Sequence, residues 1–196
     1  INPANIQRIE SVGASRGVIQ QIGEGYASSG ITGTMAAALA SLAPVFLMRS
    51  ATASGSRIAQ IDRVRLLYTT IVAFTTPITT GRRLSLFRGV SSSPVTSGGA
   101  AIDPNPPKHL IYGASVFDSA SGGDTRIATT ATLTATNVTF EVVPMKIMSL
   151  AHAGTAGYFE ERVIDFQDSP LILRAGEVMA VRAGQAFEAA GTWSLG

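Results

Sequence analysis

The spacing of apolar residues changes near residue 30 and divides the chain into two parts. Asn2-Pro3 resembles a helix N-cap followed by proline at the first helical position. Apolar residues follow at helical spacing, interrupted by glycines, up to about Gly30. We therefore predict a partly helical N-terminal arm over residues 1–30. Its apolar stripe is expected to be buried on its own domain or on a neighbouring protein, which makes six residues candidate partner contacts: Ile6, Ile9, Val12, Val18, Ile19 and Ile22.

From Ile31 onward the apolar residues recur every second position, and β-branched and aromatic residues are enriched. This period indicates strands and not helices. The longest run, Arg57–Thr75, has no clean apolar face before Leu66-Leu67-Tyr68, so we expect two strands or one strand bent at a bulge. The other predicted strands are Val45–Ser50, Arg82–Val90, Leu110–Phe117, Thr125–Val143, Lys146–Leu150, Glu160–Phe166, Leu171–Leu173, Glu177–Ala183 and Gly191–Leu195.

Turn signals separate these strands, and the stretch Ser91–Pro107 reads as a long surface loop. Short strands with a turn every eight to fifteen residues or so are typical of a sandwich or barrel, and no alternation of strands with helices is visible. We predict an all-β fold, an antiparallel β-sandwich of jelly-roll type over residues 31–196. Tyr68 and Phe74 are expected in its core.

Composition narrows the function classes. Hydrophobic residues make up 45% of the chain and charged residues only 14%, below the roughly 25% usual for soluble domains. A surface of small neutral residues suits permanent burial against neighbours. The net charge is +2 and the arginines are scattered, so we expect solvated or interface arginines and no direct binding of nucleic acid. The apolar run Met35–Met48 is too short for a membrane span and contains Pro44.

Each catalytic or metal-binding motif in the sequence lacks the neighbouring residues or the secondary structure that its chemistry requires. The chain has no cysteine, which excludes disulfides, cysteine-zinc sites and cysteine nucleophiles. Gly13–Gly17 has the form G-x-S-x-G, but helix-like residues precede it where a nucleophile elbow needs a strand. His109 and His152 lie in separate loops, and a metal site would need them to converge with a carboxylate. The possible carboxylates are Asp103, Asp118 and Asp165. We expect no metal, no cofactor and no enzymatic activity.

Three weaker patterns are interpreted as structural. Glu160 and Glu161 are adjacent, so on a strand they point to opposite faces and cannot form a glycosidase pair. Asp118 and Asp124 flank a glycine turn but lack the ligand density of a calcium loop. The sequon that begins at Asn137 lies inside a predicted strand.

The last third of the chain resembles a known group of proteins. Asp168–Arg182 combines a proline, an apolar strand, a Gly-Glu turn and a second apolar strand, and Ala189–Trp193 ends in Gly-Thr-Trp. This is similar to a pattern near the end of β-sandwich virion proteins of tailed bacteriophages. Gly176 suits a tight hairpin and Trp193 a core or interface anchor. The resemblance, which covers about 30 residues, implies a capsid decoration or tail-associated protein.

The leading hypothesis is a non-enzymatic capsid decoration, or cement, protein located in the virion. It would associate with itself, for example as a trimer, and clamp other virion proteins such as the major capsid protein. The alternative is a tail- or fibre-associated module that recognises a host-surface glycan. A third reading, a jelly-roll enzyme, lacks the histidines for the usual metal site.

Overall fold

The computed structural model describes residues 28–36, 39–52, 58–75, 82–94, 98–102, 115, 117, 123–150, 156–166, 169–187 and 191–196. These residues form thirteen strands, and they contain no helix. Each strand pair is antiparallel. The prediction of an all-β, antiparallel fold is confirmed. The predicted arm lies outside the described residues except for residues 28–30.

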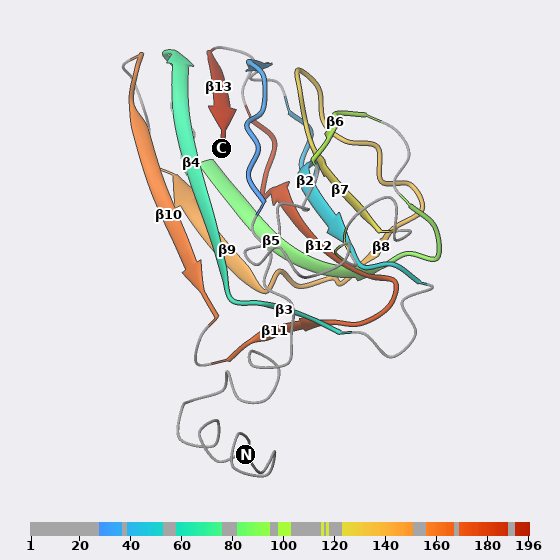
Figure 1. The fold of residues 1–196 in the computed structure, drawn as a ribbon. Helices are drawn as coiled ribbons and strands as arrows, with labels where there is room; N and C mark the ends of the chain where they lie inside the picture. Colours follow the sequence, from blue (N-terminus) through green and yellow to red (C-terminus); the bar gives the residue numbers. More distant parts are fainter. Residues whose placement is uncertain are drawn as a thin grey trace, which may run out of the picture.

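One sheet has four strands and is centred on β4 (Figure 1). Its order is β1 (Met35–Ala36), β13 (Thr192–Leu195), β4 (Arg63–Val72) and β10 (Phe159–Asp165). The ladder between β13 and β4 continues past the strand end, because Leu67 and Gly196 exchange backbone hydrogen bonds of 2.7 and 2.9 Å. The central strand is therefore flanked on both sides by strands from the last quarter of the chain.

The second sheet has seven strands. Its main order is β6 (Ala100–Ala101), β7 (Asp124–Ile127), β2 (Pro44–Arg49), β12 (Glu177–Ala183) and β5 (Arg82–Val90). Two further strands pair with different parts of β5, namely β8 (Thr139–Phe140) and β9 (Lys146–Leu150). The bounds of β5, β9, β11 and β12 are those that the alternation predicts.

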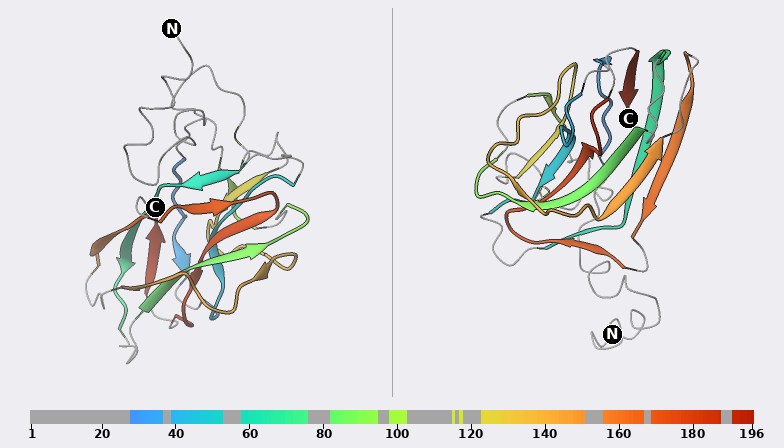
Figure 2. Two further views of the ribbon diagram at one scale, coloured as in Figure 1. Left: turned by 90° about the horizontal axis from the view of Figure 1, so that it is seen from below. Right: turned by 180° about the vertical axis from the view of Figure 1, so that it is seen from behind.

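A two-stranded ribbon of β3 (Ala59–Ile61) and β11 (Leu171–Leu173) runs across one end of the molecule (Figures 1 and 2). β3 leads into β4 after a single break at Asp62, and β11 follows β10 in the chain. The backbone N–H of Phe166 donates to the carbonyl of Asp62 at 2.8 Å and joins the two ladders. The prediction that Arg57–Thr75 forms two strands or a bent one is confirmed.

The two sheets and the ribbon share one apolar core. Trp193 is fully buried, with ring centroids 5.6 Å from Tyr68 and 5.4 Å from Phe187. Tyr68 and Phe74 are buried as predicted. The inward residues of the two sheets meet around these rings. They include Leu66, Ile164 and Leu195 on one side and Val45, Leu84, Leu86, Met148, Met179 and Val181 on the other.

A second, smaller core lies on the other face of the seven-stranded sheet. Val178 and Ala180 of β12 pack there with Leu47 and Leu133. Thus β12 is buried on both faces. The segment between β7 and β8 covers this face through Leu133 and partly buried neighbours, namely Ala135, Val138 and Phe140.

The strand material predicted over Thr125–Val143 is present only near its two ends. β7 occupies one end and β8 only two residues near the other. The apolar residues between them do alternate, but they pack on the outer face of the seven-stranded sheet and form no extended ladder; Leu133 makes a single backbone hydrogen bond to Pro44 of β2 at 2.9 Å. Asn137 consequently lies in a turn and not in a strand.

Gly176 lies in a tight turn between β11 and β12, but the predicted hairpin is wrong, because β11 pairs with β3 and β12 pairs with β2 and β5. The φ of Gly176 is 76°, in the left-handed region that glycine tolerates best. The turn is fastened to two neighbouring segments, because the N–H of Gly176 donates to Ser50 at 3.0 Å and its carbonyl accepts from Ser91 at 2.9 Å.

We expect Trp193→Ala to lower the free energy of unfolding by about 3–5 kcal/mol, because it leaves a cavity between the sheets. Urea unfolding followed by far-ultraviolet circular dichroism measures this, since Trp193 is the only tryptophan and its fluorescence is lost. Val142→Ala is the control. Val142 is 96% exposed, and its truncation is expected to change stability by less than about 0.5 kcal/mol.

Candidate functional site

Most residues singled out in the sequence lie outside the described part of the chain. These are the six candidate partner contacts Ile6, Ile9, Val12, Val18, Ile19 and Ile22, together with Gly13–Gly17, Asp103, His109, Asp118 and His152. The predictions made from them stay predictions.

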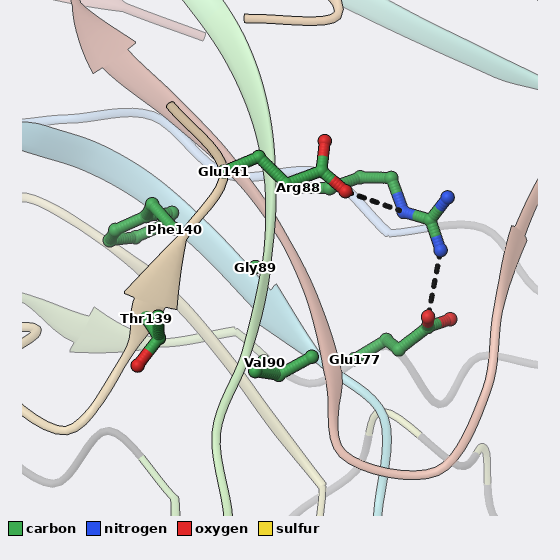
Figure 3. Close-up of a pocket in the computed structure, with 7 residues that line it drawn as sticks. All are labelled: Arg88, Gly89, Val90, Thr139, Phe140, Glu141 and Glu177. Atoms are coloured by element: carbon green, nitrogen blue, oxygen red, sulfur yellow. Dashed lines mark hydrogen bonds and ion pairs between the residues drawn. The ribbon is translucent and has the colours of Figure 1, made fainter. Parts of the chain in front are cut away.

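One shallow hollow, of about 200 Å³, lies over β5, β8 and β12 (Figure 3). Arg88 lies between two carboxylates: its Nη2 is 2.7 Å from Oε1 of Glu177, and its Nε is 4.0 Å from Oε1 of Glu141. The other carboxylate oxygen of Glu177, Oε2, accepts a hydrogen bond from the backbone N–H of Arg174 at 2.6 Å. These charges satisfy one another, and the hollow is smaller than the roughly 300 Å³ at which small-molecule sites begin.

A neighbouring hollow of about 460 Å³ is lined by small polar residues, which are Thr52, Ser91, Ser92, Asn137 and Thr139 with Val90, Ala175 and Gly176. Two of its polar side chains, those of Asn137 and Ser91, hydrogen-bond within the protein. The Asn137 amide donates to the carbonyls of Ser93 and Pro94 at 3.0 and 2.9 Å. The Ser91 hydroxyl lies 2.7 Å from the Ser93 carbonyl. The described lining contains no base that would activate this serine as a nucleophile.

Among the described residues, no cluster of three or more acidic or histidine side chains is arranged so that it could hold a metal ion. Asp165 pairs with Arg63 at 3.0 Å, and Asp124 is buried opposite Arg49 in the pairing of β7 with β2. Among the same residues, no helix is long and apolar enough to cross a membrane.

Two arginines contradict the expectation that the scattered arginines are solvated or at interfaces. Arg49 and Arg82 are at most 1% exposed. The Arg82 guanidinium lies 3.6 Å from the centre of the Phe74 ring, a cation–π contact. Arg49 Nε donates to the Ser91 carbonyl at 3.1 Å. Burial lowers the pKa of Arg49, and the negative charge of Asp124 acts in the opposite direction.

The single tryptophan is not available to a ligand. Trp193 is fully buried, so a sugar ring cannot stack on it. The predicted role of Trp193 as a core anchor is confirmed, whereas the glycan-binding alternative has no exposed tryptophan to use.

The most distinctive surface is the outer face of the four-stranded sheet. Leu66, Tyr68 and Ile164 point into the core, so the residues of opposite parity on β4 and β10 point outward. Four of these outward residues are large and apolar. Ile31 lies near one of them, Leu67, because a side-chain carbon of each lies within about 4 Å of the position that a Cβ atom on Gly196 would take. We call this set the outer face; its members are Ile31, Leu67, Ile71, Phe159 and Val163, which are 40–70% exposed.

Ion pairs stand beside the apolar residues of the outer face. Arg63 contacts Asp165 at 3.0 Å, and Arg65 Nε donates to Glu161 at 2.8 Å. Glu160 points to the opposite face of β10 and pairs with Arg162. The prediction that Glu160 and Glu161 point to opposite faces is therefore confirmed. The sequence signal for the outer face was the apolar run Leu66-Leu67-Tyr68, in which both parities are apolar.

No protein-family model matches this chain, and neither a curated protein nor a solved structure matches it. The resemblance to virion proteins thus stays a prediction from residues 168–182 and 189–193. Within that stretch, Gly176 and Trp193 serve turn geometry and core packing.

We expect Asp124→Asn to lower the free energy of unfolding by about 3 kcal/mol, because it removes the negative charge that acts on buried Arg49 and that lies 3.9 Å from Arg126. Urea denaturation of the wild type and the variant measures the effect. Asp165→Asn is the matched control; it removes an exposed ion pair with Arg63 and should cost at most about 1 kcal/mol. Equal losses in both variants would contradict a special role for the buried pair.

Proposed function

We propose that this chain is a non-enzymatic structural subunit of a viral particle, of the capsid decoration type found in tailed bacteriophages. Its antiparallel strands would form a jelly-roll-like sandwich that is displayed on the particle. Its partners would be further copies of itself and the major capsid protein, and its location the virion.

The observation that carries this proposal is the outer face. Monomeric proteins scatter single apolar residues over their surface, whereas a group of them on one sheet face marks an interaction site. Leu67, Phe159 and Val163 are close neighbours in the β4–β10 ladder, since Phe159 pairs with Thr69 and Val163 with Arg65. A partner that covered them would remove this apolar surface from water.

The rest of the described surface supports a structural role over chemistry. The two hollows are lined by groups that hydrogen-bond or ion-pair within the protein. The low charge content of the chain, 14%, suits a surface that is covered by neighbours in an assembly. An assembly protein needs complementary surface and rigidity, which a packed β fold provides.

We expect the protein to be present in intact purified particles, and Leu67→Ser/Phe159→Ser to weaken its binding to particles depleted of it by at least about tenfold, because apolar interface anchors are lost. Co-sedimentation with particles and quantitative mass spectrometry measure these outcomes. Val142→Ser is the matched control, because Val142 is exposed but lies outside the outer face. Absence of the protein from purified particles would overturn the proposal.

A further inference from the structure

Strand β10 is the last strand of its sheet on the side away from β13, and no described strand pairs with its other edge (Figures 1 and 2). The direction of its backbone groups follows from the ladder. Thr70 donates to Tyr158 at 2.7 Å and Phe166 to Asp62 at 2.8 Å, so the even-numbered residues of β10 hydrogen-bond to β4. The backbone groups of Phe159, Glu161 and Val163 are consequently directed toward the open edge.

Residues at equal distances before and after Glu161 in β10 have side chains that could pair with each other. The residues one position away, Glu160 and Arg162, have opposite charges. Two positions away, Phe159 and Val163 are both apolar, and three positions away Tyr158 and Ile164 are apolar. Two antiparallel copies of this strand would therefore pair apolar residues with apolar residues, and Glu160 with Arg162, while the two Glu161 residues would lie opposite each other at the axis.

We infer that a second copy of this chain pairs antiparallel with β10 about a two-fold axis at Glu161. The odd-numbered residues would form the hydrogen-bonded pairs, as the direction of their backbone groups requires. Phe159 of one copy would lie opposite Val163 of the other on the outer face. Glu160 would lie opposite Arg162 on the inner side. Each of these pairs occurs twice because of the symmetry.

The two central glutamates repel each other in this arrangement, and an ion pair within each chain offsets part of this repulsion. Each Glu161 already accepts from Arg65 of its own chain, so the axis would carry two carboxylates and two guanidinium groups. Arg162 donates to the Ser149 carbonyl of β9 at 3.0 Å and pairs with Glu160 of its own strand. The charges of opposite sign across the proposed pairing are therefore those of Glu160 and Arg162 on the inner side.

Neighbouring registers are less favourable. An axis at Arg162 would place two arginines opposite each other and Phe159 opposite Asp165. An axis at Val163 would place Glu161 opposite Asp165, so that like charges face each other. Only the axis at Glu161 pairs both apolar residues with apolar residues.

This inference rests on the proposed function and specifies how the structural subunit associates with itself. The paired sheets would form one continuous eight-stranded sheet. Their outer faces would merge into a single surface, still open on one side for a different virion protein.

A cysteine scan tests the register, because the wild-type chain has no cysteine. Under the proposed pairing, two Cα atoms at position 161 lie about 5.5 Å apart, within the roughly 4.4–6.8 Å that a disulfide spans. Those at position 162 would be about 8 Å apart and those at 163 farther. We expect Glu161→Cys to form a disulfide-linked dimer under mild oxidation, with at least about tenfold less from Arg162→Cys and Val163→Cys. A dimer linked best at 162 or 163 would overturn the register.

A charge exchange tests the pairing without a crosslink. Glu160→Arg and Arg162→Glu each place like charges opposite each other at two symmetric positions and should raise the dimer Kd about tenfold or more. The double variant E160R/R162E restores opposite charges and should return the Kd to within about threefold of wild type. Sedimentation equilibrium measures all four proteins, and circular dichroism checks that each is folded.

The outcomes separate this inference from the proposed function. Failure of the double variant to recover dimerisation would overturn the pairing at β10. If the protein binds particles and forms oligomers while these variants leave the oligomers unchanged, the inference fails and the proposed function stands. A wild-type protein that stays monomeric at all concentrations and is absent from particles would overturn both.

Discussion

The structure depends on the burial of β12 on both of its faces. Met179 and Val181 face the core between the sheets, while Val178 and Ala180 face the smaller core on the outside. A strand buried in this way needs hydrogen-bonded neighbours on both edges and cover on both faces, since its backbone and side chains have no access to water. β2 and β5 supply the edges, the four-stranded sheet covers one face, and the segment between β7 and β8 covers the other.

Strands defined by the local alternation of side chains could be predicted from the sequence, whereas features that depend on contacts between distant residues could not. The two-residue period and the turn residues that bound each run identified β5, β9, β11 and β12, including β12, whose two faces are both buried. The period failed between β7 and β8, where Leu133 and Ala135 keep the same period but cover the outer face of the seven-stranded sheet and form no extended strand in it. The burial of Arg49 and Arg82 was likewise unpredictable. Their partners, Asp124 and Phe74, reach them through tertiary contacts that no local pattern encodes.

The outer face could be predicted only in part. The apolar run Leu66-Leu67-Tyr68 showed that neither face of the strand is polar, but not that one face is left uncovered. Edge strands of monomeric proteins are commonly protected by inward-pointing charges. β10 carries such charges in Glu160 and Arg162, yet they have opposite signs and are spaced two residues apart. The same residues that discourage pairing with unrelated strands are thereby compatible with one specific strand, a second copy of β10.

The position of β4 in the fold has a consequence for biosynthesis. Both of its neighbours, β10 and β13, begin some 90 or more residues later in the chain than β4 ends. During translation β4 emerges from the ribosome with an apolar side that has no partner, and it must wait for the last quarter of the polypeptide before its sheet can close. Such long-range pairing slows folding and prolongs the exposure of the apolar side of β4 that the core later buries.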